Sequence, residues 1–227
     1  MTKLLLVVLG MVPISILHGA DGSQPRLNDG VISYIAEGGQ RTIIATGERA
    51  ADLWVSSDGA VIAFIGIAKQ TPDASGLTLS PLIEESHVYT ARKADQFAPH
   101  RVPLKPIPIN RRSWTVFRDP KAAPDLKSVF FSIPYTLTTS RVFRASLNTG
   151  DYEPIGDATD FCVVWGGGHT GDLLLQERSI PADPSTGVVY RCVLGSKSGT
   201  RTPVSDQCED FRMFATEWSQ AQGGACR

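Results

Sequence analysis

The stretch Ser56–Phe64 reads SSDGAVIAF, a tight turn followed by a run of apolar residues. A related stretch, Ala123–Phe131, reads APDLKSVFF and has the same order of features. In each copy an aspartate, Asp58 or Asp125, stands where its short side chain can accept hydrogen bonds from the backbone of the turn. The apolar residues that follow are typical of a buried strand. A repeated turn–strand unit predicts an architecture built from repeats.

Short β-branched or aromatic runs continue on both sides of these two copies. They cover 31–35, 41–46, 52–55, 61–67, 87–91, 101–104, 114–117, 129–133, 140–145, 152–155, 161–165, 172–177, 187–192 and 200–204. Prolines in 105–110 indicate an extended connector there. Residues 211–218 fit one more strand or a short helix. Because few stretches show sustained helical periodicity, the sequence predicts an all-β fold.

The spacing of the turns indicates the size of the repeat. Asp125 lies 43 residues before Gly168, which belongs to the next turn. A propeller blade contains about 40–45 residues. Asp58 and Asp125 are 67 residues apart, and this distance approaches the same length once a predicted surface loop at 69–86 is removed.

The two stretches resemble the repeat of TolB-like β-propellers, which are relatives of WD-type blades. In that family a Ser-Pro-Asp-Gly-like turn joins the first and second strands of a blade. The resemblance covers residues 48–208 and is clearest over 52–91 and 114–147. The chain departs from the pattern because the first copy lacks the proline, the second lacks the glycine, and the third turn reads Gly-Gly-Gly-His169.

The resemblance implies a propeller-like array of four-stranded antiparallel blades, about three full blades plus a partial one. A hairpin at 31–46 is expected to form half of a fourth blade, which 209–218 would complete. Full closure of a propeller takes roughly four to eight blades. A small closed ring of four blades and an open array therefore both remain possible.

The N-terminus has the order of features found in secretory signal peptides. Lys3 precedes the apolar run 4–17, and the small residues Gly19 and Ala20 follow. The run of about 14 residues is shorter than the roughly 20 that a membrane span needs. We expect cleavage near Ala20, with an uncut anchor as the alternative, and export to the periplasm or the extracellular space. The predicted organisation is a signal peptide at 1–20, a flexible lead-in at 21–30, one domain at 31–218 and a tail at 219–227.

Four cysteines lie in the last third of the chain, which fits an oxidising compartment. Four cysteines allow three pairings, of which we favour Cys192–Cys208 and Cys162–Cys226. A zinc site is the alternative, but the chain has no close Cys-x-x-Cys pair and no histidine near these cysteines. No metal or cofactor is expected.

Aromatic and basic residues supply the candidates for a binding site. Trp54, Trp114 and Trp165 recur near the ends of predicted first strands, where they pack between blades or form a rim that stacks on a sugar or peptide. Arg111 and Arg112 form a local anion site or a solvated loop. His169 lies in a glycine-rich turn that lacks the following helix needed to bind phosphate.

The leading functional hypothesis is an exported, non-enzymatic module that binds a protein or peptide. The formal net charge of −1 shows no basic excess of the kind that nucleic-acid binding uses, so no nucleic-acid partner is expected. The alternative is a secreted hydrolase or lyase of a propeller class acting on a glycan or peptide. Its candidate catalytic residues are Asp58, Asp125, His169 and Asp172. A third hypothesis is a structural protein whose blades pair between chains.

Overall fold

The computed structural model describes residues 24–36, 38–68, 85–109, 112–114, 116–179, 187–196 and 199–227, with only the backbone described for 109 and 112–114. The expected signal peptide and its cleavage site lie outside the described residues. In the described part of the chain, no helix is long and apolar enough to cross a membrane.

Three antiparallel sheets, each built on four consecutive strands, form the body of the molecule, and the third has a fifth strand at its edge. Blade 1 consists of β4 (Arg49–Val55), β5 (Val61–Ile67), β6 (Ser86–Arg92) and β7 (His100–Arg101). Blade 2 consists of β10 (Arg118–Ala122), β11 (Ser128–Pro134), β12 (Ser140–Ser146) and β13 (Tyr152–Ala158). Blade 3 consists of β14 (Asp160–Gly166), β15 (Leu173–Ser179), β16 (Val189–Gly195) and β17 (Arg201–Ser205). These sheets confirm the expected all-β array of four-stranded blades.

The partial blade is the N-terminal sheet, formed by β1 (Arg26–Asn28), β2 (Val31–Ile35) and β3 (Arg41–Ile44). Asp29 and Gly30 have φ of 50° and 78°, the left-handed values that a two-residue hairpin turn needs. The sequence Asp29-Gly30-Val31-Ile32 resembles the turn–strand phrase of blade 1, Asp58-Gly59-Ala60-Val61-Ile62, with one residue fewer. The stretch expected to be a flexible lead-in therefore contains the first strand of this sheet.

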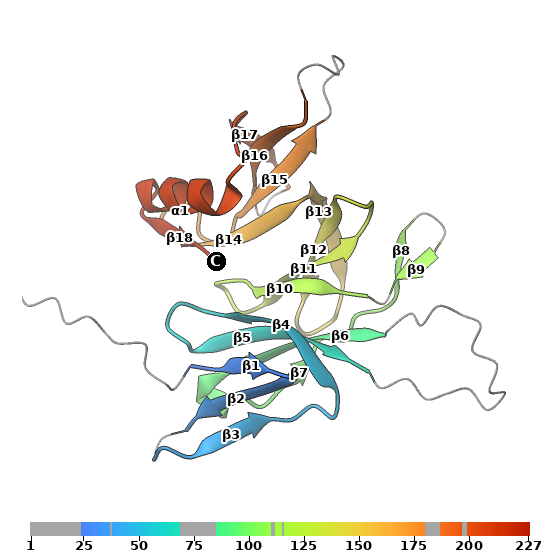
Figure 1. The fold of residues 1–227 in the computed structure, drawn as a ribbon, viewed down its shortest axis with the longest axis vertical. Coiled ribbons are helices and arrows are strands. Elements are labelled where there is room, and N and C mark those ends of the chain that lie inside the picture. Colours follow the sequence, from blue (N-terminus) through green and yellow to red (C-terminus); the bar gives the residue numbers. More distant parts are fainter. Residues whose placement is uncertain are drawn as a thin grey trace, which may run out of the picture.

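The sheets are stacked face to face (Figure 1). A hydrophobic layer fills each interface between them. Strand β5 shows why its sequence is apolar at every position. Ile62 and Phe64 pack against the N-terminal sheet, while Ala63 and Ile65 face blade 2. Fully burying a side chain of this size contributes about 1.5–3 kcal/mol, so each central strand stabilises two interfaces.

The C-terminal segment covers the outer face of blade 3 instead of completing the N-terminal sheet, so the expected role of 209–218 is wrong. Residues Phe211–Ala221 form α1, which Asp210 caps by accepting the Met213 backbone N–H at 3.1 Å. Phe211 and Ala215 of this helix pack on Leu174. The expected tail contains the end of α1 and a last strand, β18 (Gly224–Cys226), which pairs with β14.

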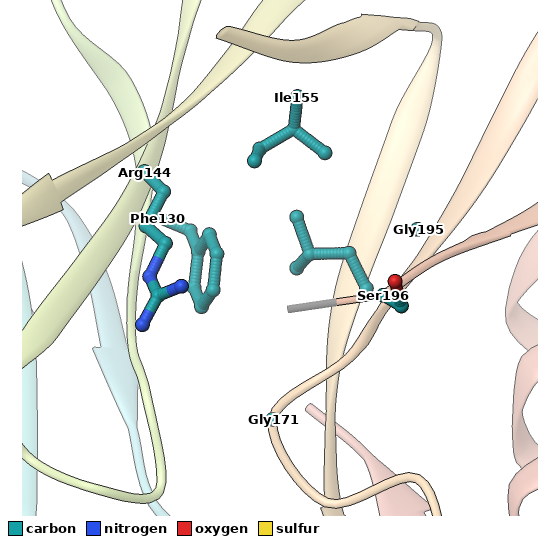
Figure 2. Close-up of a pocket in the computed structure, with 7 residues that line it drawn as sticks. Phe130, Arg144, Ile155, Gly171, Gly195 and Ser196 are labelled. Atoms are coloured by element: carbon teal, nitrogen blue, oxygen red, sulfur yellow. The ribbon is translucent and has the colours of Figure 1, made fainter. Parts of the chain in front are cut away.

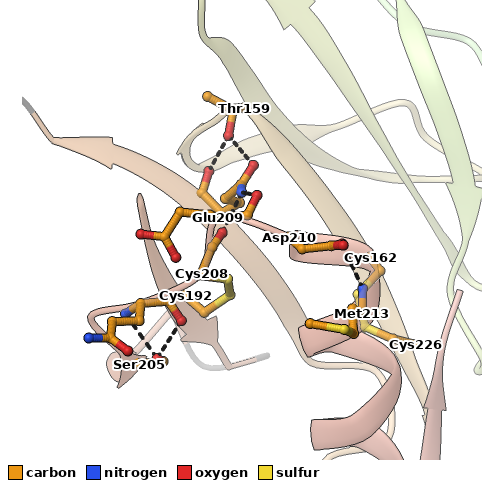
Figure 3. The surroundings of a disulfide bond; sticks show 11 residues. Thr159, Cys162, Cys192, Ser205, Cys208, Glu209, Asp210, Met213 and Cys226 are labelled. Atoms are coloured by element: carbon orange, nitrogen blue, oxygen red, sulfur yellow. Dashed lines mark hydrogen bonds between the residues drawn. A yellow bond between two sulfur atoms is a disulfide. The ribbon is translucent and has the colours of Figure 1, made fainter. Parts of the chain in front are cut away.

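Both favoured disulfides are present and both fasten this C-terminal cover (Figure 3). Cys162–Cys226 joins β14 to β18, with Cα atoms 5.5 Å apart. Cys192–Cys208 joins β16 to the segment that leads into α1, with Cα atoms 5.7 Å apart. All four cysteines belong to the hydrophobic layer beneath α1 or pack against it.

The link between blades 1 and 2 differs from its prediction. The expected extended connector and the expected strand at 114–117 instead form a two-stranded hairpin, β8 (Ile107–Ile109) with β9 (Arg112–Trp114). Pro108 is compatible with this position because a two-stranded hairpin leaves edge positions where no N–H is needed. The first strand of blade 2 is β10, four residues after Trp114.

Candidate functional site

The connections between strands differ between the two ends of the array. At the turn end, the strands are joined through 56–60, 93–99, 123–127, 147–151, 167–172 and 196–200. At the loop end, they are joined through the three longest connections, 68–85, 102–117 and 180–188, and through the short links 135–139 and 159. Because longer surface connections carry binding residues more often than tight turns, the loop end is the better place to seek a site.

A groove of about 330 Å³ opens at the loop end between blades 1 and 2. Its apolar part is formed by Ile65, Ile67, Val116 and Phe117, and its charged part by Arg49, Asp52, Arg118 and Asp119. Ser86 lies between the two blades and accepts the backbone N–H of Phe117 at 2.7 Å, which fixes one wall against the other. The groove thus combines an apolar floor with two arginines and two aspartates.

Two β-bulges place the aspartates of the groove. The pairing of β4 with β5 shifts register between Ala51 and Trp54, and that of β10 with β11 shifts between Arg118 and Lys121. Asp52 and Asp119 lie in these breaks with φ of 47° and 49°. Aspartate is one of the residues that tolerates this left-handed conformation, and bulges often redirect side chains beside functional sites.

The ionisable groups on the first strands of the three blades influence one another's pKa values. Partial burial raises the pKa of Asp52, and the nearby Asp119 carboxylate raises it further. Burial also raises the pKa of Asp160, the first residue of β14, and lowers the pKa of Lys121. The Lys121 ammonium lies 5.0 Å from the centre of the Phe161 ring. The first strands of all three blades therefore contribute ionisable groups to one region.

The sequence analysis missed these aspartates, although the sequence contained a signal. Asp52 stands six residues before the turn residue Asp58, and Asp119 stands six residues before Asp125. The repeated phrase therefore extends farther toward the N-terminus than the turn. A lone charged residue within a strand-like run gives no sign of a bulge, so the sequence alone does not distinguish Asp52 and Asp119 from ordinary strand residues.

The structure brings together two of the three tryptophans proposed for binding. Trp54 of β4 and Trp165 of β14 have ring centres 5.7 Å apart, so the first strands of blades 1 and 3 contact each other through these rings. Because the two rings pack against each other, less of their aromatic surface is left to stack on a sugar or peptide. Trp114 lies on β9 of the hairpin, away from the first-strand position that the sequence suggested.

The remaining proposed residues are spread over different parts of the chain. Arg112 begins β9, its side chain is outside the described part, and Arg111 lies outside it altogether. His169 belongs to the turn between β14 and β15, where its Nδ1 lies 3.1 Å from Asp172 Oδ2. The His169 ring is 5.4 Å from that of Trp218, so it contacts α1.

Asp58 and Asp125, the carboxylates of the enzyme hypothesis, serve their own turns. Asp58 Oδ1 accepts the Ser56 hydroxyl at 2.6 Å and the Ala60 backbone N–H at 3.0 Å. Asp125 Oδ1 accepts the Lys127 backbone N–H at 3.0 Å. Among the described residues, no three His, Cys, Asp or Glu side chains are grouped as a metal ion would require.

A second, smaller hollow lies between blades 2 and 3 (Figure 2). The Arg144 guanidinium and the Phe130 ring form one wall, and Gly195 and Ser196 lie opposite them. With a volume of about 10 Å³ it holds at most a single water molecule. It shares Phe130, Arg144 and Gly171 with an adjoining hollow of about 200 Å³, and the groove between blades 1 and 2 is larger than both.

Comparison with known proteins gives matches to solved structures alone. No family model and no curated protein matches the sequence. The β-propeller domain of the Trilobed protease from Pyrococcus furiosus is similar with a TM-score of 0.48 and 12% identity, over 82% of this chain and 57% of that one. TolB from Acinetobacter baumannii is similar with a TM-score of 0.42 and 13% identity, over 81% of this chain and 43% of that one.

A peptidase is among the other similar structures. The acylaminoacyl peptidase from Pyrococcus horikoshii has a TM-score of 0.46 and 11% identity, over 78% of this chain and 28% of that one. This chain thus spans at most 57% of the length of these three proteins. Its stacked four-stranded sheets have counterparts in β-propeller proteins, TolB among them, and this similarity concerns the fold alone.

Proposed function

We propose that this protein is an exported module that binds an extended segment of a protein partner in the groove between blades 1 and 2. The groove itself carries this proposal, because it is a concave surface between two blades in which apolar residues lie beside polar and charged ones. Its position at the end with the longer connections supports the same assignment.

The chemistry of the groove favours a peptide over a strongly charged ligand. Arg49 and Arg118 provide two positive charges, and Asp52 and Asp119 provide two negative ones. Such a balanced rim suits the alternating donors and acceptors of a peptide backbone, while the partly exposed Ile67 and Val116 suit an apolar side chain. A nucleic acid would meet repulsion from the aspartates as well as attraction from the arginines.

Export is the second part of the proposal. Two disulfides within one small module favour an oxidising compartment, since cytosolic thiols are kept reduced. The apolar N-terminal run after Lys3 supports passage through a secretory route. The periplasm and the extracellular space are both compatible with these observations.

The test is affinity capture from the native compartment with a charge reversal in the groove. Arg118→Glu replaces an exposed guanidinium of the rim by a third carboxylate, so the captured partner should be lost or reduced at least tenfold. Lys127→Glu makes the same charge change at an exposed residue of the turn end and should leave capture unchanged. Equal capture by both variants, with both folded, would place the binding surface elsewhere.

A further inference from the structure

The outer face of the N-terminal sheet carries an apolar patch. Val31, Ile35 and Ile43 are 40%, 37% and 59% exposed. They are three of the six large apolar side chains that are exposed in the described part of the chain, and all three lie on this one face. Exposed apolar residues are ordinary when scattered, but a cluster on one sheet face marks an interaction surface.

Alternation along the strands assigns every residue of this sheet to a face. Leu27, Ile32, Tyr34 and Ile44 belong to the layer against blade 1. On β2, Ser33 lies opposite Arg26 of β1 and Ile43 of β3. Ile35 of β2 lies opposite Arg41 of β3. The opposite face therefore presents the three apolar side chains together with Arg26 and Arg41. We call these five residues the outer patch.

The stacking of the molecule shows why this face is unusual. Each face of blades 1 and 2 is covered by a hydrophobic layer, and α1 covers the outer face of blade 3. Terminal units of stacked arrays need a polar outer face or a cover. A helix thus covers the C-terminal end of the array, and the N-terminal sheet forms its other end (Figure 1). The outer face of that sheet presents the β-branched side chains of Val31, Ile35 and Ile43 to solvent.

The charged side chains on the strands of this face are both basic. Arg41 donates from Nε to the Ser33 hydroxyl at 3.1 Å and so lies across the middle of the face. Arg26 is exposed at the same level of the sheet as Ser33 and Ile43. Among the described residues of this hairpin sheet, the carboxylate is that of Asp29, which lies in the β1–β2 turn. An apolar surface bordered by two guanidinium groups is complementary to an apolar surface bordered by carboxylates.

We propose that the outer patch is a docking surface for an acidic amphipathic helix of a partner protein. The helix would lie on the N-terminal sheet as α1 lies on blade 3, placing apolar side chains on Val31, Ile35 and Ile43 and carboxylates beside Arg26 and Arg41. This surface is separate from the groove at the loop end. The patch requires no catalytic chemistry and no change of fold.

Charge argues against a second copy of this chain as the occupant. A symmetric dimer would stack the same face on itself and bring four arginines into one interface. Like charges placed together across an interface cost several kcal/mol. A partner with flanking carboxylates converts the same arginines into favourable contacts.

The experiment uses the full chain and two synthetic helical peptides of about 18 residues. Both peptides carry leucines spaced three and four residues apart, and one has glutamates beside the leucine stripe where its twin has lysines. Fluorescence anisotropy should show at least tenfold tighter binding of the glutamate peptide. Ile43→Lys and Arg26→Glu should each weaken that binding at least fivefold, and added salt should weaken it as well.

The matched control is Leu137→Lys, because Leu137 is fully exposed at the tip between β11 and β12. This variant should bind the glutamate peptide as the unmodified protein does, and circular dichroism should show all three variants folded. Equal binding of the two peptides, or an equal loss from Leu137→Lys, would overturn the proposal. Dimerisation in sedimentation that Ile43→Lys abolishes would identify a second copy as the occupant and overturn it too, as would binding to anionic vesicles in place of the peptide.

Discussion

At the scale of single residues, Ser56 links the sequence of the repeat to its stability. It is 2% exposed, its hydroxyl donates to Asp58, and its oxygen accepts the buried Val61 backbone N–H at 2.9 Å. Ser56→Ala leaves this amide without a partner, which should cost about 1–3 kcal/mol in the free energy of unfolding. Urea unfolding measures the loss, and Ser57→Ala, at an exposed neighbour, serves as the control. Equal stability of the two variants would contradict this role for Ser56.

The same turn sets a pH dependence. The Ser56 hydroxyl and then the Ala60 N–H lower the pKa of Asp58 below its ordinary value of 3.8. A carboxyl whose pKa is lowered by folding stabilises the protein above its unfolded pKa, and this contribution is lost as pH falls through the folded pKa. Ser56→Ala should therefore lose less stability than the unmodified protein when the pH is lowered from 5 to 2 (roughly the window of a carboxyl group with a lowered pKa).

Asp52 has the opposite effect on the pH dependence of stability. Because burial and then Asp119 raise its pKa above the ordinary 3.8, the ionised form is disfavoured in the folded protein. Its ionisation lowers stability as pH rises through the folded pKa, and the effect is absent below the unfolded pKa. Asp52→Asn, which tolerates the left-handed φ of 47°, should raise the melting temperature at pH 7. The gain should shrink toward pH 3, and a gain that is larger at pH 3 would contradict this assignment.

At the scale of elements, the two disulfides should differ in their contribution. Cys162–Cys226 closes a separation of 64 residues, and Cys192–Cys208 closes one of 16. The chain-entropy model gives roughly 4 kcal/mol for the first and roughly 3 kcal/mol for the second. Replacing each pair by alanines and comparing urea midpoints should show the larger loss for the β14–β18 link. The reverse order would show that unfolded-chain entropy is not the dominant effect.

Elements that the sequence predicted well are those whose pattern depends on local features. Strands β5 and β11 follow an aspartate turn and are mostly apolar, so the sequence predicts them close to their observed bounds. Phe211, Phe214, Ala215 and Trp218 fit a strand or a helix by sequence alone. The choice is decided by the outer face of blade 3, which the helix covers, and the packing of helix on sheet is a tertiary feature. The three-residue strands β1 and β18 are too short to leave a pattern of their own.

At the scale of the whole molecule, the count of blades followed from turn spacing, but the groove did not. Asp52, Arg118 and Ser86 come from three different strands, and their meeting depends on how blades 1 and 2 pack. The pairing of Trp54 with Trp165 likewise depends on the curvature of the array. Sequence spacing gives the number of repeats and leaves the angle between them undetermined.

The curvature can be tested through these two tryptophans. Because Trp54 and Trp165 join blades 1 and 3, a double-mutant cycle with Trp54→Ala and Trp165→Ala should give a coupling of about 0.5–1.5 kcal/mol. Trp218→Ala, whose ring contacts His169, provides the comparison and should show no coupling to Trp54→Ala. If the two substitutions have additive effects on the free energy of unfolding, blades 1 and 3 do not contact each other through these rings.

Site-specific photocrosslinking in the native compartment tests the binding groove most directly. A benzoylphenylalanine at Ile67, half-buried in the groove, is compared with one at Lys127, exposed at the turn end. The account predicts that the residue-67 probe crosslinks one defined partner, that this product disappears when Arg118→Glu is added, and that the residue-127 probe does not form it. Crosslinking of the same partner from residue 127 alone would contradict the assignment of the groove as the binding site.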